Sequence, residues 1–124
     1  MKPLALALVA VALLAACGGG GAGGGGGQPA GSTKVTMTDF HFDPSNISVP
    51  HGKVVFFLVN ASGSLQHDMA IRDSSNNRVA ISELVSAGDS TTFTVDNLAA
   101  GSYTIVCTQP GHEASGMSGK LTVT

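Results

Sequence analysis

The 124-residue sequence contains few cysteines and few charged residues, and both features reduce the number of function classes that fit it. It has only two cysteines, Cys17 and Cys107, and charged residues make up 11% of the chain, with a net charge of −2. No run of lysine or arginine occurs, so nothing favours binding to nucleic acid or to anionic lipid. The sequence also shows no internal repeat. No serine–histidine–aspartate or paired-carboxylate pattern suggests an enzymatic reaction.

The first 16 residues predict an export signal. Lys2 precedes an apolar run over 4–16 that is too short to cross a bilayer comfortably. Residues 14–17, Leu-Ala-Ala-Cys, resemble the lipobox of bacterial lipoproteins, which implies cleavage before Cys17 and a lipid on its sulfur. The alternative is an ordinary cleaved signal, or an uncleaved anchor, with Cys17 incidental. We therefore expect a protein held by this lipid on the extracytoplasmic face of a bacterial membrane, periplasmic or on the cell surface.

A glycine-rich segment separates this leader from the rest of the chain. Residues 18–32 read GGGGAGGGGGQPAGS, and with so few side chains to bury they are expected to stay disordered. The chain thus divides into a signal peptide (1–16), a lipidated cysteine with its linker (17–32) and one folded domain (33–124). Processing leaves Cys107 as a single thiol, which is unusual in an exported protein, unless it pairs with Cys17.

Short alternating runs of apolar residues predict that the domain is all-β. Frequent turn signals separate the runs, which favours an antiparallel sandwich or barrel. Ile81, Leu84 and Val85 suggest a single helical turn between 80 and 86. The expected strands cover residues 34–42, 47–60 with an inner Pro-His-Gly turn, 67–72, 90–95, 101–107 and 119–124.

Four potential metal ligands stand in or near the loops of this domain. Residues 107–117 read CTQPGHEASGM, a segment too rich in glycine and proline for a helix. It contains Cys107, His112 and Met117, with four residues between one potential ligand and the next. His67 follows the strand over 53–60 and a loop of glycine and serine. If the strands form a sandwich, the two loops can meet at one end. Two imidazoles, a thiolate and a thioether then converge, which is the ligand set of a blue-copper centre.

Each of these four residues also has an ordinary explanation when taken alone. His67 can be a strand-edge histidine bonded to backbone, and His112 a solvated loop residue. Cys107 can be a small buried side chain, and Met117 ordinary core. The full set, in this order within one β-patterned chain, indicates copper.

From about residue 33 to the C-terminus, the chain resembles the cupredoxins, which include plastocyanin, azurin, auracyanin and rusticyanin. YTIVCTQPGHEASGMSGKLTV is similar to the family's late strand–Cys–loop–His–loop–Met–strand segment, and FHFDPSNISVPHGKVVFFLVNAS to its N-terminal strands. The ligand spacing is closest to that of the rusticyanin, sulfocyanin and auracyanin group, and not to the shorter Cys–His interval of plastocyanin. The resemblance implies a cupredoxin-like Greek-key β-sandwich with one type 1 Cu(I)/Cu(II) ion. Its ligands would be His67, Cys107, His112 and Met117.

Three positions beside the ligands would tune the site. Many cupredoxins have an asparagine after the first histidine ligand, and its side chain helps to tie the two ligand loops together. Asp68 stands there, so its carboxylate either ties the loops differently or lowers the reduction potential by favouring Cu(II). Gln66 occupies the position of the distant axial carbonyl of azurin-like sites, and Pro110 lies close to the second histidine.

The resemblance also implies that His112 faces solvent and passes the electron through its ring edge. Small or apolar residues surround it in the loop, and such a patch suits weak, quickly dissociating contacts with redox proteins. We expect Asp68 and Glu113 at the rim of this patch, with Glu113 a solvated loop acid. The docking patch itself would comprise Leu65, Pro110 and Ala114.

One-electron transfer is the function that this ligand set favours. Val106 and Thr108 flank Cys107, so the adjacent histidine that wires electrons to a second copper in multicopper oxidases and nitrite reductases is missing. A dinuclear centre would need a second cysteine nearby. We predict a monomeric electron carrier, not an enzyme, that meets membrane-associated redox partners transiently. The alternative is an exported copper carrier or storage protein that hands over the ion itself; the complete ligand set disfavours a purely structural or sensory module.

Overall fold

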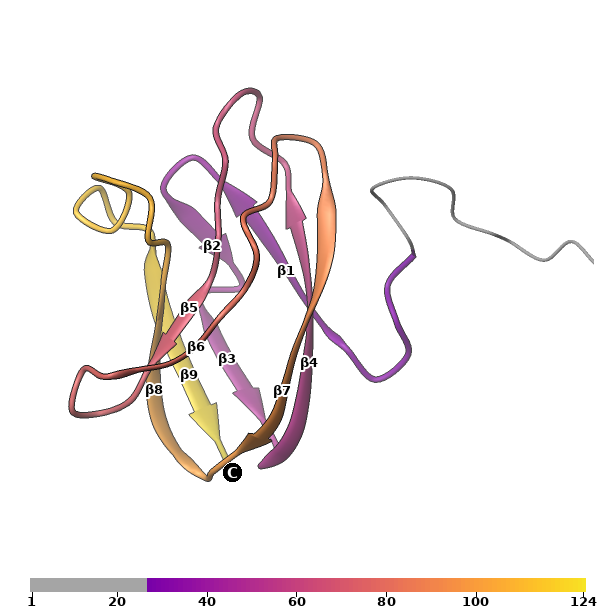
Figure 1. The fold of residues 1–124 in the computed structure, drawn as a ribbon, viewed down its shortest axis with the longest axis vertical. Coiled ribbons are helices and arrows are strands. Elements are labelled where there is room, and N and C mark those ends of the chain that lie inside the picture. The colour runs from indigo at the N-terminus through magenta and orange to yellow at the C-terminus, as the bar shows by residue number, and fades with distance from the viewer. Residues whose placement is uncertain (1–26) are drawn as a thin grey trace, which may run out of the picture.

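The computed structural model describes residues 27–124, which form a two-layer β-sandwich (Figure 1). One sheet has the strand order β2-β1-β4-β7 and the other β3-β9-β8-β5-β6. The strands are β1 (Thr33–Thr38), β2 (His41–Asp43), β3 (Asn46–Val49), β4 (Gly52–Asn60), β5 (Ala70–Arg72), β6 (Arg78–Ile81), β7 (Ser90–Leu98), β8 (Gly101–Val106) and β9 (Ser118–Val123). This arrangement confirms the predicted all-β sandwich, but not its purely antiparallel pairing, since β1 pairs with β4 and β3 with β9 in parallel.

The predictions for the leader concern a part of the chain that the structure does not describe. The signal peptide, the lipid on Cys17 and most of the glycine-rich linker fall on residues 1–26. Just before β1, the N–H of Ser32 donates to the carbonyl of Pro29 at 3.2 Å and closes a turn. The division of the chain at residues 16 and 32 stays a prediction.

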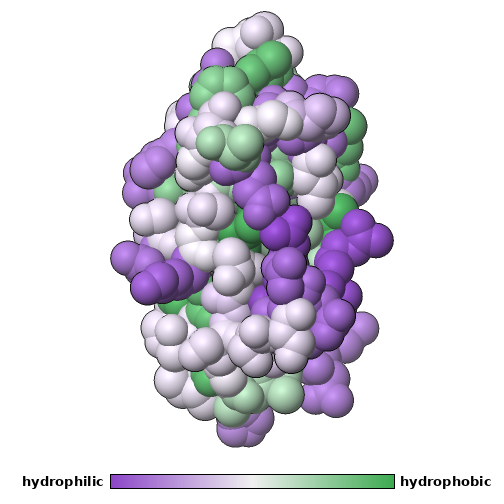
Figure 2. Space-filling view, turned by 90° about the vertical axis from the view of Figure 1, so that its left-hand side faces the viewer, coloured by the Kyte–Doolittle hydropathy of each residue, from purple (hydrophilic) through white to green (hydrophobic). Residues whose placement is uncertain are grey.

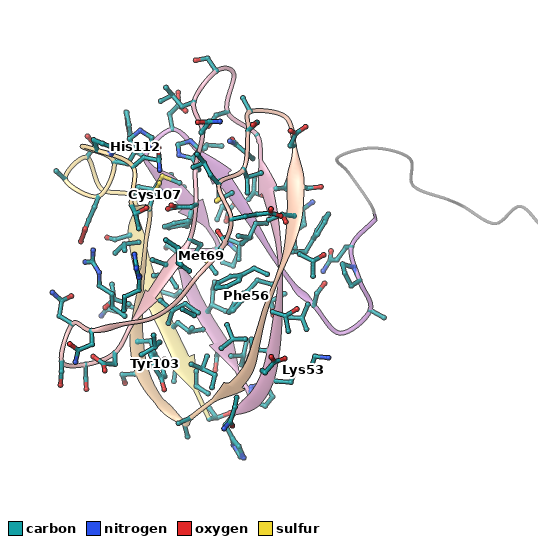
Figure 3. All side chains as sticks on the ribbon, in the orientation of Figure 1. Lys53, Phe56, Met69, Tyr103, Cys107 and His112 are labelled. Carbon is teal, nitrogen blue, oxygen red and sulfur yellow. The ribbon has the colours of Figure 1, made fainter. Side chains whose placement is uncertain are left out.

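The core lies between the two sheets and follows from the alternation of apolar residues along the strands. Val35 of β1, Leu58 of β4 and Ile105 of β8 are fully buried. Figure 3 shows Phe56 and Met69 in the same interior. Each large apolar side chain removed from water in this way contributes about 1.5–3 kcal/mol to folding.

Two segments differ from the sequence prediction. The expected strand over 34–42 is interrupted by a turn at Asp39 and Phe40, after which β2 pairs antiparallel with β1. Phe40 adopts φ = 65° and is 38% exposed, so its side chain leaves the core. The expected helical turn over 80–86 is wrong: β6 ends at Ile81, and Val85 forms an isolated bridge to His67. Within residues 27–124, no helix is long and apolar enough to cross a membrane.

The strand directions bring several loops to one end of the sandwich. β4 and β8 both run towards the upper end in Figure 1, where the loops after them carry His67 and the segment 107–117. β1 is parallel to β4, with Met37 opposite Asn60, so the turn between β1 and β2 reaches the same end. The predicted meeting of the two ligand loops is therefore confirmed.

Candidate metal centre

Three donor atoms from the two loops form a small triangle. The Nδ1 atoms of His67 and His112 lie 3.1 Å apart, and the Sγ of Cys107 lies 3.8 Å from the first and 3.5 Å from the second. Typical metal bonds of about 2.0 Å to nitrogen and 2.3 Å to sulfur place donors of a trigonal plane about 3.5–3.7 Å apart. The donors present therefore fit one ion with little rearrangement. Figure 3 shows Cys107 and His112 together at the upper end.

Met117 is held beside two of these residues by the backbone. The N–H of Cys107 donates to the carbonyl of Met117 at 3.1 Å, and the N–H of Met117 donates to the carbonyl of His112 at 3.0 Å. The Met117 side chain is fully buried in the same apolar cluster as Cys107. A thioether in this place suits a soft metal ion such as Cu(I).

The loop over 107–117 is compact because its own backbone closes it. The N–H of His112 donates to the carbonyl of Gln109 at 3.1 Å, which forms the turn that carries the histidine. Gly111 and Gly116 adopt φ = 79° and 106°, values that side chains disfavour. Glycine at these two positions therefore lets the loop return to β9 in few residues.

His67 is fixed at its backbone and at the ring nitrogen that points away from the triangle. Its backbone N–H and carbonyl pair with Val85 at 3.1 and 2.8 Å. Its Nε2 lies 2.6 Å from the Oγ of Ser62 and 3.4 Å from Oδ1 of Asp39. A proton on Nε2 is thereby stabilised, which leaves the lone pair of Nδ1 directed at the other donors.

Burial moves the pKa values of two of these groups in the directions that favour their neutral forms. It lowers the pKa of the His67 imidazole below 6.5, although the hydrogen bond to Asp39 opposes this effect. It also raises the pKa of the Cys107 thiol, against opposing backbone hydrogen bonds from Asp68 and Gln109. At neutral pH the metal-free site therefore holds a neutral imidazole and a thiol. Metal binding must release the thiol proton.

Asp68 links the first ligand loop to the residue that follows Cys107. The N–H of Thr108 donates to Oδ1 of Asp68 at 2.7 Å, and the Thr108 hydroxyl donates to Oδ2 at 2.5 Å. The Asp68 side chain is only 4% exposed. The expectation that Asp68 lies at the rim of a surface patch is therefore wrong, because the residue is buried and both of its carboxylate oxygens accept from Thr108.

Sequence reasoning missed Asn60, which organises the loop before His67. Its side-chain N–H groups donate to the carbonyls of Leu65 and Val85 at 2.8 and 2.9 Å. Its Oδ1 accepts from the N–H of Ser62 at 2.9 Å. Asn60 is 1% exposed, so these bonds satisfy an amide that burial would otherwise penalise. A polar residue at the end of an expected strand carries no sequence signal of this role.

Glu113, which was expected to be a solvated loop acid, is exposed as expected and also forms an ion pair. Arg72 of β5 donates to both of its carboxylate oxygens, at 2.7 and 3.1 Å. The pair is partly exposed, with the Glu113 side chain 45% accessible. It ties the loop that carries His112 to the end of β5.

A hollow of about 590 Å³ lies beside His112, which is half-buried. Part of the apolar surface seen in Figure 2 lies at this upper end of the molecule. Leu65 and Pro110 of the predicted docking patch line the hollow, whereas Ala114 is exposed outside it. The Nε2 of Gln66 donates to the Oγ of Ser86 at 3.4 Å. No charged residue is among the eight that line the hollow: Ser64, Leu65, Gln66, Ser86, Ala87, Gln109, Pro110 and His112.

Comparisons with known proteins agree with this geometry. The model of the family described as copper binding proteins, plastocyanin/azurin family, matches residues 29–124. The copper-resistant cuproprotein CopI of Rubrivivax gelatinosus is 28% identical over 108 residues, which cover 74% of this chain and 66% of that protein. The chain thus spans slightly less than two thirds of this relative's length.

Solved structures show the same fold. Dithionite-reduced auracyanin from the photosynthetic bacterium Roseiflexus castenholzii has a TM-score of 0.68 and 22% identity, covering 78% of this chain and 99% of that one. Auracyanin B has a TM-score of 0.69 and 25% identity, covering 80% and 92% of the two chains. These likenesses confirm the predicted cupredoxin-like sandwich.

Proposed function

The chain belongs to the plastocyanin/azurin family of copper-binding proteins, and from this premise we propose that it carries single electrons between redox partners. Its one type 1 copper ion, when bound, supplies a one-electron couple between Cu(I) and Cu(II). We assign the ligands as Nδ1 of His67, Nδ1 of His112, the thiolate of Cys107 and the thioether of Met117. The observation that carries this proposal is the triangle of donor atoms, with edges of 3.1, 3.5 and 3.8 Å.

The fixed geometry of the donors supports electron transfer. Asp68 ties the two ligand loops together, and Asn60 holds the loop before His67. Because these contacts are made by the protein itself, the donors are preorganised and move little when the oxidation state changes. A site that reorganises little accepts and releases electrons quickly.

The exposure of the ligands indicates where a partner would dock. His67, Cys107 and Met117 are at most 1% exposed, whereas His112 is half-buried beside the uncharged hollow. The buried ligands exclude water and other ligands, and the His112 ring connects them to the surface. We propose that partners dock transiently over Leu65, Pro110 and Ala114, around His112.

A second candidate function is copper resistance or storage, in which the ion itself is handed over. The observation that favours it is the name of the relative CopI, a copper-resistant cuproprotein. Against it stands the burial of three of the four assigned ligands. An ion carrier needs an open site whose ligands a recipient can reach, whereas an electron carrier keeps its metal.

We further propose that the chain acts as a monomer at the extracytoplasmic face of a bacterial membrane. The sequence of the first 17 residues supports this location, with the lipid on Cys17 as anchor. We also propose that it catalyses no reaction of its own, because the four assigned ligands leave no coordination position on the copper free for a substrate.

Copper retention distinguishes electron transfer from ion delivery. The copper-loaded full chain would be reduced and reoxidised repeatedly in the presence of a Cu(I) chelator, with the protein-bound copper measured after each cycle. An electron carrier is expected to retain its copper through many cycles. Transfer of most of the copper to the chelator in the first reduction would instead support copper delivery.

A further inference from the structure

The turn between β1 and β2 carries two side chains to the two histidines of the metal centre. Oδ1 of Asp39 lies 3.4 Å from Nε2 of His67. The ring of Phe40 meets the ring of His112 edge-on, with centroids 5.1 Å apart and planes at 79°. Neither residue belongs to the loops that carry the donor atoms. Figure 1 shows this turn at the same upper end as those loops.

The conformation of Phe40 is unusual for a large side chain. Its φ of 65° lies in the left-handed region, which bulky residues rarely adopt, and the ring is 38% exposed. Burial in the core therefore does not explain the conformation. Strained residues persist where their surroundings fix them, often at functional sites. Here the ring lies against a half-buried histidine.

Each contact acts on a different property of its histidine. Two groups face Nε2 of His67, the Oγ of Ser62 at 2.6 Å and Oδ1 of Asp39 at 3.4 Å. A hydroxyl can donate to Nε2 or accept from Nε2–H, whereas a carboxylate can only accept, so Asp39 is the group that favours the tautomer with a free lone pair on Nδ1 and makes that nitrogen a stronger donor. Phe40 stands edge-on to His112 and limits rotation of its imidazole about the Cβ–Cγ bond. Rotation of this ring would carry Nδ1 away from the other two donor atoms.

We propose that the β1–β2 turn is a third positioning segment of the copper site. Asp39 sets the tautomer and donor strength of His67, and Phe40 holds the ring of His112 in its ligating orientation. This inference rests on the proposed function, since it takes His67 and His112 as copper ligands. It assigns positioning roles to two residues outside the ligand loops.

Ring spectra of the metal-free full chain test the two contacts without copper. Nitrogen NMR of the histidines should show His67 mainly as the Nε2–H tautomer. Asp39→Ala should increase the Nδ1–H fraction of His67 several-fold, because the carboxylate that stabilises Nε2–H is lost. Asp96→Ala is the matched control, since Asp96 is exposed near the end of β7 that lies away from the site. Phe40→Asn should shift the ring signals of His112.

Copper-loaded protein supplies the second readout. Asp39→Ala should lower the affinity for Cu(II) about 10-fold, the size expected when a partner of a ligating histidine is removed. Phe40→Asn should speed copper loss to a chelator about 10-fold, while Phe40→Tyr, which keeps the ring, should restore the original rate. Asparagine tolerates a positive φ, so Phe40→Asn should not destabilise the metal-free fold.

The outcomes separate this inference from the proposed function. If the wild-type chain forms a thiolate–copper charge-transfer band but both variants match it in ring spectra, affinities and copper loss, the positioning roles are overturned and the electron-carrier proposal stands. If the wild-type chain forms no such band, the proposed function fails. The metal-free ring spectra then still decide whether Asp39 and Phe40 orient the histidines.

Discussion

Single residues around the metal centre are fixed by hydrogen bonds that the protein completes without an ion. The carboxylate of Asp68 accepts both the N–H and the hydroxyl of Thr108. The amide of Asn60 makes three bonds to the loop before His67 and to Val85. Where the remaining partner is buried, as in the bonds of Asn60 to Ser62 and Val85, removing one side leaves the other unsatisfied, which costs more than the bond itself contributes.

The tie between the ligand loops should therefore be visible in stability. Asp68→Ala removes the acceptor of both the N–H and the hydroxyl of Thr108. Because Thr108 is exposed, water can replace the carboxylate, and we expect the free energy of unfolding to fall by about 0.5–1.5 kcal/mol. Denaturant unfolding of the metal-free full chain measures this change. Asp96→Ala removes an exposed carboxylate and should have little effect. Equal stabilities of the two variants would show that Asp68 does not tie the loops.

The metal-free protein should also lose stability in mild acid because of His67. Burial lowers the pKa of this imidazole below 6.5, its ordinary value. The unfolded chain then binds the proton more readily than the folded chain, so this contribution is present above pH 6.5 and lost as the pH falls through the folded pKa. Unfolding at a series of pH values should show a smaller loss in His67→Gln. The same pH dependence in both proteins would contradict this assignment.

At the scale of elements, a short hydrogen-bonded loop returns the chain from Cys107 to β9. Gly116 stands near its end with φ = 106°, and a Cβ built there would meet the carbonyl oxygen of Phe40 only at 3.9 Å. The space would accept a methyl group, so the backbone angle alone requires glycine. The loop thus depends on one conformation that other residues reach only under strain.

A glycine comparison tests this dependence. Gly116→Ala should lower the free energy of unfolding by about 1–3 kcal/mol, the cost of holding a side chain at such a φ. Gly63→Ala is the matched control, because a Cβ there meets nothing within 4 Å and no positive φ is involved. Thermal unfolding of both variants should show a loss for the first alone. A stable Gly116→Ala variant would mean that the loop has another conformation available.

The strands could be predicted from alternation, and the errors arose where other forces decide. β4, β8 and β9 follow the expected runs, because their apolar residues enter one core, by alternation in β9 and as a continuous buried run in the middle of β4. β6 is an edge strand with exposed Val79 and Ile81, so its apolar residues do not mark a buried face. The turn at Asp39 and Phe40 contains no glycine or proline, and no pattern in the sequence marks it.

At the scale of the whole molecule, the candidate metal site lies away from the point where the N-terminal segment joins the sandwich. β1 starts at Thr33, opposite Phe56 in the middle of β4, and runs towards the site, which it reaches at Met37 and Asn60. The C-terminus lies at the opposite end of the sandwich (Figure 1). In the proposed function, this leaves the surface around His112 free to meet a partner.

The four candidate ligands could be proposed from the sequence because their chemistry and spacing are local, and one family motif holds three of them. The surface around them could not be predicted from the sequence. Whether Asp68 faces solvent or Thr108 depends on how two distant loops meet, and so does the pairing of Arg72 with Glu113. The uncharged hollow beside His112 likewise unites three loops that the sequence keeps apart.

An uncharged docking surface predicts how a new charge would act on electron exchange. Ser64→Glu places a carboxylate in the hollow, so two copies that meet there would repel each other. Electron self-exchange between the Cu(I) and Cu(II) forms should slow about 10-fold at low salt and recover as salt is added. Ser48→Glu, on the outer face of β3, adds the same charge away from the site. Equal rates for both variants would place electron exchange elsewhere.

The central claim is a type 1 copper centre built from His67, Cys107, His112 and Met117. The visible absorption spectrum of the full chain, titrated with Cu(II), tests it most directly. The account predicts an intense thiolate-to-copper charge-transfer band that saturates at one copper per chain, bleaches with a reductant and returns with an oxidant. Only weak d–d bands, or reduction of the copper followed by its release, would contradict the account.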